Sequence, residues 1–334
     1  MDLKTLTEIN APSGHEQAIR RFLLDELKKL GFAPVLDRMG NVVVVKEGTG
    51  DAPRKRVMVS AHMDEVGLIV TSATEDGYLR IAAAGGIDPR VLVSKRVTVG
   101  EDKLPGVIGA VPIHLQSAAE RKHVLSMDEL LVDIGAKNKD EAECKAPMGT
   151  YISFDTPYVE YGDGFACGKA FDDRVGCLSL LRLLQEELPV DLVACFVSEE
   201  EVGCRGAKGA AFQQEPDVGI VLEGTTCNDL GDVPETAHVC EAGHGVAVSF
   251  MDGASIANRA LFRKALDVAK QENIPHQVKH SVSGGNDGGA IQRAREGVPV
   301  VVLSVPCRYI HSPSSVVKLS DVESQFALVK ALVK

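Results

Sequence analysis

Tryptophan is absent from this chain of 334 residues, and aromatic residues make up only 4% of it. A hydrophobic core must therefore be built from Val, Leu, Ile and Ala. The apolar fraction is 45% and the charged fraction 25%, a composition that is typical of globular proteins and excludes a disordered or fibrous chain. The length is too great for one ordinary core and predicts two domains.

Basic residues are outnumbered, with 36 Lys and Arg against 47 Asp and Glu and a formal net charge of −11. Binding to nucleic acid would require clustered Lys and Arg, so we expect no nucleic-acid partner. Long apolar runs are also missing, since none approaches the ~20 residues needed to cross a bilayer. The N-terminus lacks the profile of a signal peptide. We therefore expect no membrane partner and a cytoplasmic location.

Clustered cysteines are lacking as well. The eight cysteines stand singly, and no C-x-x-C pair occurs. This excludes a zinc ribbon and a thioredoxin motif. Reduced thiols in the cytosol are the simpler interpretation, and a secreted disulfide framework is the less favoured alternative.

The beginning and the second half of the chain alternate between helical and strand patterns. Ser13 and Glu16 have the spacing of a capping box, and a helical apolar stripe follows as far as Gly31. Apolar runs at 41–45 and 57–61 predict strands buried on both faces. Later, helices predicted at 173–188 and 257–271 alternate with strands at 191–198, 218–222 and 298–305. This alternation predicts an α/β sandwich around a largely parallel or mixed sheet.

Residues 68–162 have a different texture, in which short apolar runs alternate with Gly, Pro and Asp. Such a pattern indicates a small β-rich domain with tight turns, interrupted by a helical segment at 127–131 after Ser126. We interpret it as an insertion into a discontinuous domain made of residues 1–67 and 163–334.

Polar clusters follow or interrupt the predicted strands, where the ligand crevice of an α/β sheet forms. His62 and Asp64 are two residues apart and would point to the same side of a strand. A carboxylate beside an imidazole can fix the tautomer of a metal-bound His. An ordinary polar strand end explains this cluster about equally well.

Two further clusters contain adjacent carboxylates. Capping of a helix accounts for Asp173, whereas Asp172 falls outside the helix and could bridge two cations. Three consecutive acids at 199–201 follow a buried-looking strand, and their mutual repulsion would raise their pKa values unless cations compensate. Such cations would also leave one carboxylate free to act as a base.

Glu223 and His311 complete the set. Taken alone, each has an ordinary interpretation, a solvated strand-end acid and a structural histidine. Two His and several acids without clustered Cys nevertheless fit a two-metal hydrolase better than a structural zinc site. Zn²⁺, Mn²⁺ and Co²⁺ accept such nitrogen and oxygen ligands.

With these motifs in place, the sequence resembles the M42 family of metallo-aminopeptidases, which includes glutamyl aminopeptidases and the tetrahedral TET peptidases. The matching motifs run through essentially the whole chain: A-H-M-D-E-V-G at 61–67, K-A-F-D-D-R-V-G at 169–176, E-E-V-G-C-R-G-A at 200–207, L-E-G-T-T at 222–226 and R-Y-I-H-S-P at 308–313. The resemblance implies a phosphorylase/hydrolase-like α/β sandwich carrying the catalytic site, with a small inserted PDZ-like or β-barrel domain for dimerisation. Some family members have been labelled endoglucanases.

The resemblance also implies roles for single residues. One of two divalent ions (Zn, Co or Mn) would be held by His62, Asp172 and Glu223, and the other by Asp172, Glu201 and His311. Glu200 would be the general base and Asp64 would orient His62, while Glu199 lies outside the functional pair. The Asp172–Asp173 peptide bond is often cis in such sites.

The implied function is removal of N-terminal residues from short peptides through a water that bridges the two metals. The implied assembly is a homo-oligomer, a tetrahedral dodecamer formed through dimers. A metal-free glycoside hydrolase with paired carboxylates is the alternative, and a non-catalytic binding module is a third. The sequence departs from the family at Glu223, where many members have Asp, and in the stretch 284–292, which lies near the active site in the family.

Overall fold

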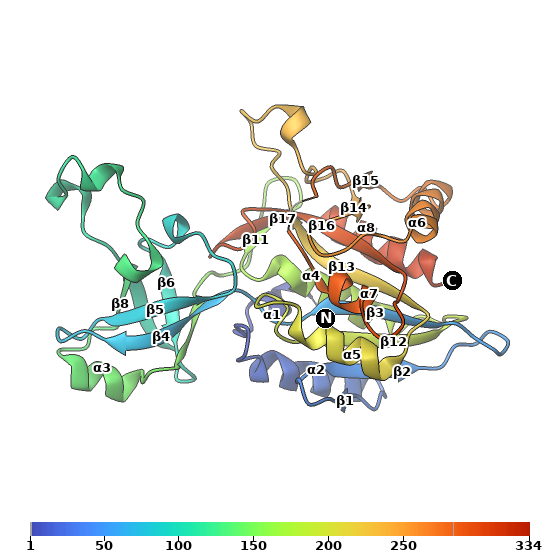
Figure 1. The fold of residues 1–334 in the computed structure, drawn as a ribbon, viewed down its shortest axis with the longest axis horizontal. Helices are drawn as coiled ribbons and strands as arrows, with labels where there is room; N and C mark the ends of the chain where they lie inside the picture. The colour runs from blue at the N-terminus through green and yellow to red at the C-terminus, as the bar shows by residue number, and fades with distance from the viewer. Residues whose placement is uncertain (1, 283) are drawn as a thin grey trace.

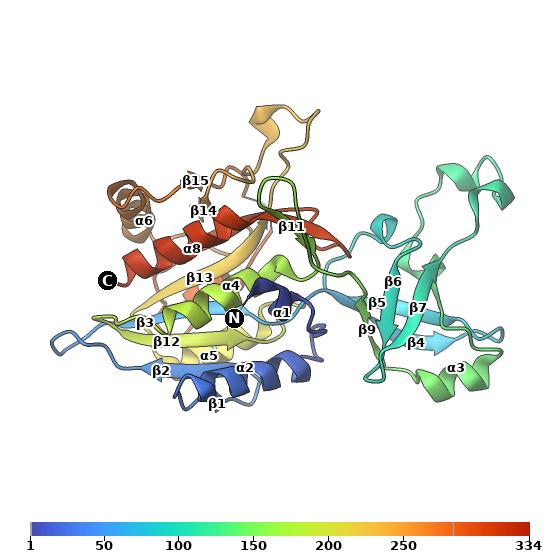
Figure 2. The same cartoon turned by 180° about the vertical axis from the view of Figure 1, so that it is seen from behind.

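The protein folds into a large mixed sheet covered by helices and a separate small barrel (Figure 1). The computed structural model describes residues 2–282 and 284–334. In both views the barrel projects from one end of the sheet (Figures 1 and 2). This arrangement confirms the predicted α/β sandwich with a β-rich insertion.

Four parallel strands form the centre of the large sheet: β12 (Asp191–Val197), β3 (Arg56–His62), β13 (Val218–Thr226) and β16 (Val300–Arg308). Antiparallel strands flank them, with β2 (Val42–Lys46) and β1 (Val35–Leu36) on one side and β17 (Ser315–Lys318), β11 (Phe165–Gly168) and β10 (Val159–Tyr161) on the other. β14 (Val246–Ser249) also pairs with β16, and β15 (His276–Val278) pairs with β14. The carboxyl ends of the four central strands therefore meet at one edge.

Helices cover both faces of this sheet, which explains why its central strands are apolar on both sides. One face carries α1 (Leu3–Thr7), α2 (Gln17–Lys29), α4 (Phe171–Leu183), α6 (Arg259–Gln271) and α8 (Leu319–Leu332). The other face carries α5 (Arg205–Gln214) and α7 (Asp287–Gln292). Along β3, Val57 and Val59 face the first group, while Met58 faces the second.

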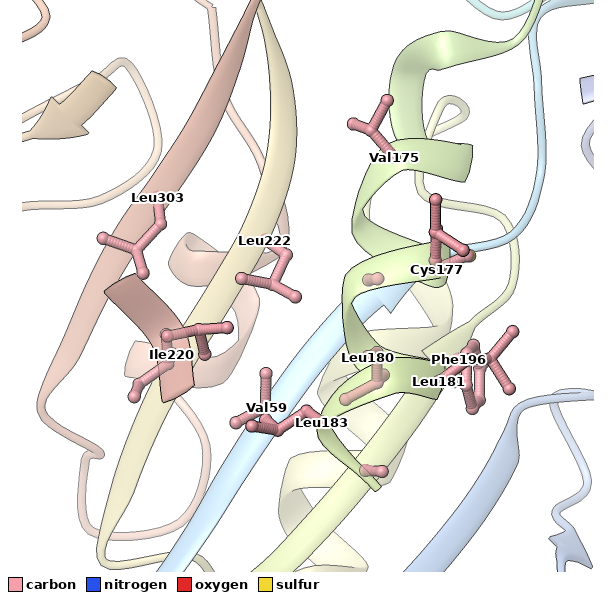
Figure 3. Close-up of a cluster of buried hydrophobic side chains, with 14 of the residues drawn as sticks. Val59, Val175, Cys177, Leu180, Leu181, Leu183, Phe196, Ile220, Leu222 and Leu303 are labelled. Atoms are coloured by element: carbon pink, nitrogen blue, oxygen red, sulfur yellow. The ribbon is translucent and has the colours of Figure 1, made fainter. Parts of the chain in front are cut away.

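The helix α4 is buried almost all round rather than along one stripe. Leu180 and Leu183 are as buried as Leu181 and Leu184, although these two pairs lie on different sides of the helix. The reason is that α4 lies between the sheet and the helices α1 and α8. Figure 3 shows its side chains packed with those of the neighbouring strands.

Several predicted boundaries were wrong by a few residues. The helix predicted to reach residue 188 ends at Leu183, and the one predicted from residue 257 starts at Arg259, after an Asn258 side chain that caps it. The strand predicted to end at 222 continues to Thr226 because it pairs with β16 from Gly219 to Thr226.

The capping-box prediction for Ser13 and Glu16 was also wrong. The helix begins later, at Gln17, with no side-chain cap. The Ser13 hydroxyl instead donates to Asp64 Oδ2 at 2.6 Å, and Glu16 Oε1 accepts the Gly14 N–H at 2.7 Å. The spacing matched the motif, but a long-range partner took the hydroxyl.

The inserted unit is a closed antiparallel barrel with its own core of aliphatic side chains. Its strands, in spatial order, are β4 (Gly67–Ala73), β5 (Leu79–Ala84), β8 (Leu131–Asp133), β7 (Leu104–Gly109), β6 (Arg96–Val99) and β9 (Tyr151–Phe154), and α3 (Lys139–Lys145) packs beside it. Short 3₁₀ turns lie at Pro89–Val91, Ile113–Leu115, Glu120–Lys122, Met127–Glu129 and Glu235–Ala237. The turn at Met127–Glu129 is the helical segment predicted after Ser126, reduced to three residues. None of the helices in the described part of the chain is long and apolar enough to cross a membrane.

Candidate active site

The residues singled out from the sequence gather at the carboxyl edge of the central strands. His62 is the last residue of β3, Glu223 lies in β13, and His311 follows β16 by three residues. Glu200 and Glu201 occupy the loop between β12 and α5, and Asp172 precedes the helical part of α4. Five segments far apart in sequence thus contribute to one site, as expected for a parallel sheet.

Asp172 stands between the two histidines. Its Oδ1 lies 3.2 Å from His62 Nε2, and its Oδ2 lies 3.4 Å from His311 Nε2. Each oxygen of one carboxylate therefore faces a different imidazole, which is the arrangement that a ligand bridging two cations requires.

Each histidine has one further acid of its own. Glu223 Oε2 lies 3.5 Å from His62 Nε2, and Glu201 Oε2 lies 3.2 Å from His311 Nε2. Glu223 Oε1 is buried and has no hydrogen-bond partner within residues 2–282 and 284–334. The site thus divides into two halves, His62 with Glu223 and His311 with Glu201, joined by Asp172.

Asp64 connects His62 to the acidic loop. The fully buried carboxylate accepts the backbone N–H groups of Glu200 at 3.1 Å and Glu201 at 3.2 Å. His62 Nδ1 lies 3.2 Å from the Asp64 carbonyl oxygen and 3.4 Å from its Oδ1. This leaves His62 Nε2 directed at Asp172 and Glu223.

The side chain of Asp173 caps the helical part of α4. The Asp172–Asp173 peptide bond is cis, and both residues have non-helical backbone angles. Asp173 Oδ1 accepts the Gly176 N–H at 2.9 Å, which is the cap expected from the sequence. One of its oxygens also lies within 4.8 Å of ligand atoms of His62 and Glu223. Among the described residues, Asp172 is the acid that contacts the ring nitrogens of both His62 and His311.

Of the three consecutive acids, Glu199 points elsewhere: its Oε2 lies 3.3 Å from Arg205 Nη1. Burial raises the pKa of Glu200 to about 7 and the pKa of Glu201 to about 8, and neighbouring carboxylates add to both shifts. The rise that the sequence predicted is therefore present at these two residues, with burial as a larger cause than repulsion. Burial also raises the pKa of Glu223 to about 8.

The histidines show the complementary effect. Burial alone would lower the pKa of His311, but its contact with Asp172 and the charge of Glu201 raise it to about 9. Burial likewise opposes protonation of His62, yet its contacts with Asp172 and Asp64 raise its pKa well above the ordinary value.

These features fit divalent metal ions. Imidazole nitrogen and carboxylate oxygen are ligands for Zn²⁺, Co²⁺ and Mn²⁺. The unpartnered Glu223 Oε1 and the raised pKa values of the acids show a surplus of buried negative charge that cations would neutralise. His62, Asp172 and Glu201 also offer ligand atoms that all lie within 4.8 Å of one another.

Sequence reasoning missed a buried layer behind the site. Lys169 Nζ lies 2.7 Å from Glu65 Oε1 and 2.8 Å from Oε2, and both side chains are buried. Arg174 is fully buried and donates to the backbone oxygens of Met63 and Leu6. These contacts hold the segment that follows His62. Their residues lie inside the matched motifs, but no spacing rule indicated that they would meet.

A cavity of about 390 Å³ opens over the site. Asp172, Glu200, Glu223 and His311 line one part of it, and the polar residues Thr225, Ser304 and Lys279 line another. Of the described residues in its lining, Ile310 is the one with a large aliphatic side chain. The stretch 284–292 reaches the cavity through Gly284, Gly285 and Asn286, so its expected position near the site is correct.

The fold and the site define an α/β enzyme whose imidazoles and carboxylates converge at the carboxyl edge of the sheet, as in hydrolases that use divalent metals. A sequence model of the M42 glutamyl aminopeptidase family matches residues 40–328. The chain belongs to this family.

Curated relatives match over nearly the full length. The glutamyl aminopeptidase of Lactococcus lactis is 33% identical, with 99% of this chain and 94% of the relative covered. The lysyl aminopeptidase of Pyrococcus furiosus is also 33% identical, with 99% and 96% covered. Relatives with different substrate names are thus about equally similar to this chain.

Solved structures agree. The TET aminopeptidase of a marine-sediment thaumarchaeon superposes with a TM-score of 0.94 at 33% identity, covering 99% of this chain and 94% of that one. The Pyrococcus horikoshii TET1 peptidase, which assembles into a tetrahedron or a large octahedral shell, gives 0.87 at 33% identity, with 99% and 98% covered. A Thermotoga maritima protein described as an endoglucanase gives 0.82 at 34% identity, with 100% and 97% covered, so the expected endoglucanase label does occur among the relatives.

Proposed function

We propose that this protein is a metal-dependent aminopeptidase that removes N-terminal residues from short peptides with two divalent ions. His62, Asp172 and Glu223 would hold one ion, and Asp172, Glu201 and His311 the other. The observation that carries the proposal is the position of Asp172, whose two oxygens face different histidines at 3.2 and 3.4 Å. Family membership supports the use of metal.

The ions, when bound, would supply Lewis acidity toward the scissile carbonyl and lower the pKa of the attacking water. The protein's own residues position and move the proton. The oxygens of Asp64 lie beside His62 Nδ1 and can accept its hydrogen, which leaves Nε2 without a proton and able to act as a ligand. It also holds the Glu200 and Glu201 backbone, which fixes the base relative to the neighbouring ligand.

Glu200 is the proposed general base. It lines the cavity beside Asp172 and Glu223, and its pKa of about 7 is close to the value at which a carboxylate can both take and return a proton at neutral pH. It would take a proton from the attacking water and pass it to the leaving amine. The substrate's α-amino group would lie against the acidic wall, which restricts cleavage to the first peptide bond.

The test combines metal removal with one substitution. Activity on a panel of aminoacyl-p-nitroanilides should vanish after EDTA treatment and return with Zn²⁺, Co²⁺ or Mn²⁺. Glu200→Gln should keep its bound metal and lose about 10²–10⁴-fold in kcat, the usual contribution of a general base. The matched control Glu199→Gln, which changes the acid paired with Arg205, should keep near-normal activity. Turnover by metal-loaded Glu200→Gln at the native rate would refute the assignment.

The glycoside hydrolase alternative draws on the endoglucanase name of one similar structure. Such an enzyme needs one acid and one nucleophile or base, and no metal. It gives no role to two histidines that share one carboxylate. Hydrolysis of carboxymethylcellulose that persists in EDTA, without peptidase activity, would favour it.

We further propose that the chain forms a tetrahedral dodecamer through dimers, with the inserted domain (68–162) making subunit contacts and residues 1–67 and 163–334 forming the catalytic domain. The similar TET1 peptidase forms a tetrahedron. The barrel loop between β7 and β8 exposes Val111, Ile113 and Leu115 by 61–71%, an apolar surface of the kind found at interfaces. Light scattering that finds a stable monomer would contradict this assembly. A cytoplasmic location is supported by the eight free cysteines.

A further inference from the structure

A buried carboxylate without a partner lies behind Glu200. Asp287 is the first residue of α7 and is 1% exposed, and neither of its carboxylate oxygens has a hydrogen-bond partner among the described residues. Removing an ionised carboxylate from water without a donor or cation is costly, so buried acids are normally paired or bound to metal. Nothing in the proposed peptidase mechanism uses this group.

Two further ligand groups meet Asp287. Cys204 directly precedes α5, and its thiol donates to Glu200 Oε1 at 3.3 Å. The helices α5 and α7 pack against each other, which brings the thiol and the Asp287 carboxylate together. One ligand atom each from Glu200, Cys204 and Asp287 lies within 4.8 Å of the other two. Bond lengths of about 2.0–2.3 Å require ligand atoms on one ion to lie no farther apart than about 4.6 Å, so the three side chains have to close in around a bound ion.

The donor set selects the kind of ion. One sulfur and two carboxylates suit borderline and soft cations such as Zn²⁺ and Cd²⁺, whereas Mg²⁺ and Ca²⁺ prefer oxygen alone. The two halves around Asp172 contain no sulfur ligand, so the two kinds of site differ in chemistry. Glu200 lines the cavity, as does Asn286 next to Asp287, which gives an ion a path from solvent.

We propose that Cys204, Glu200 and Asp287 form an additional binding site for a thiophilic divalent cation, such as Cd²⁺ or Zn²⁺ in excess. A metal–sulfur bond replaces the S–H bond of Cys204, and the proton leaves to solvent, with no change in oxidation state. Occupancy uses the Glu200 carboxylate as a ligand and removes it from proton transfer. Binding of the ion does not depend on the proposed function. The inhibition that would result from binding does rest on the proposed function, because it requires Glu200 to be the general base.

The test is a titration of the full-length, metal-loaded enzyme with Cd²⁺. We expect a thiolate-to-cadmium charge-transfer band in the ultraviolet, saturating at one ion per subunit, while atomic emission shows that the two resident ions remain. The band should vanish in Cys204→Ser. Asp287→Asn keeps the shape of the side chain but removes its charge. It should weaken Cd²⁺ binding roughly tenfold or more, because even the loss of a residue that only hydrogen-bonds to a metal ligand has an effect of this size.

Matched controls separate this thiol from the others. Cys144→Ser removes an exposed thiol, and Cys227→Ser removes one from the buried cluster with Cys240. Both variants should keep the band. Bound Cd²⁺ should also protect Cys204 from alkylation by N-ethylmaleimide, read by peptide mass spectrometry in the wild-type protein, so that the proposal does not depend on a variant that fails to fold.

A band that survives in Cys204→Ser, or the absence of both band and protection, overturns the proposal. Mg²⁺ in place of Cd²⁺ should give no protection. Peptidase inhibition that follows the band supports both the site and the role of Glu200. A protein that shows the band and protection but cleaves none of the aminoacyl substrates keeps this site and loses the proposed function.

Discussion

Asp64 holds the backbone of Glu200: the Asp64 Oδ1 atom accepts the Glu200 N–H at 3.1 Å, although the two residues are 136 positions apart in sequence. The same carboxylate accepts the Ser13 hydroxyl and lies beside His62. It therefore sets the position of a proposed ligand and of the proposed base together.

We expect Asp64→Asn to lower both metal retention and kcat by about 10–100-fold, the usual effect of changing a group that orients a metal ligand. The amide keeps the size of the side chain, but its NH₂ group cannot accept the hydrogen bonds that the carboxylate receives from the Glu200 and Glu201 N–H groups. Metal content by atomic emission and steady-state kinetics on the same samples give the measurement. Ser13→Ala removes a single contact and should have a smaller effect; an equal effect would contradict a special role for the carboxylate charge.

The gathering of His62, Glu223 and His311 could be predicted, because each lies in or shortly after the carboxyl-terminal part of an apolar strand. The parallel sheet then brings His62, Glu223 and His311 to one edge without further information. The spacing of apolar residues, which differs between helices and strands, was likewise sufficient to predict the α/β sandwich and the inserted β-rich unit.

Contacts that depend on side chains from distant segments could not be predicted. Ser13 was interpreted as a helix cap from the spacing of nearby residues alone. That spacing contains no information about Asp64, which accepts the Ser13 hydroxyl in the folded protein. Asp287 follows no strand, and its relation to Cys204 arises only from the packing of α5 on α7. The salt bridge between Lys169 and Glu65 joins residues that are 104 positions apart and that belong to two different sequence motifs. Neither motif indicates that the two side chains meet.

The stability of the metal-free protein should fall as the pH rises. The folded-state pKa values of Glu201 and Glu223, about 8, lie above the ordinary 4.5. The folded protein therefore holds more protons than the unfolded chain between about pH 4.5 and 8, and its stability decreases over this window. Thermal unfolding of EDTA-treated protein should show a lower Tm at pH 8 than at pH 6. The metal-loaded protein should lose less over the same range, and parallel curves for both forms would count against this account.

Lys279 should favour substrates with an acidic first residue. Its side chain is 8% exposed in the wall of the cavity that contains the proposed ligands. Asp88 also lines this cavity, and its Oδ2 accepts from Arg90 Nε and Nη2. We expect Lys279→Met to lower kcat/KM for glutamyl-p-nitroanilide about tenfold or more relative to alanyl-p-nitroanilide, as loss of a polar contact to substrate does. Asp88→Asn is the control and should change this ratio little. Equal losses on both substrates in Lys279→Met would point to a structural role.

The buried pair of Lys169 and Glu65 should show strong coupling in stability. Their side chains are 4% and 2% exposed, and the Glu65 carboxylate also accepts the Ala11 N–H at 2.8 Å. Lys169→Met leaves a buried charge without its partner and should cost about 3–5 kcal/mol of unfolding free energy. Adding Glu65→Gln removes that charge and should recover part of the loss. Urea unfolding of the two single variants and the double variant measures the coupling, and additive losses would show that the pair does not act as a unit.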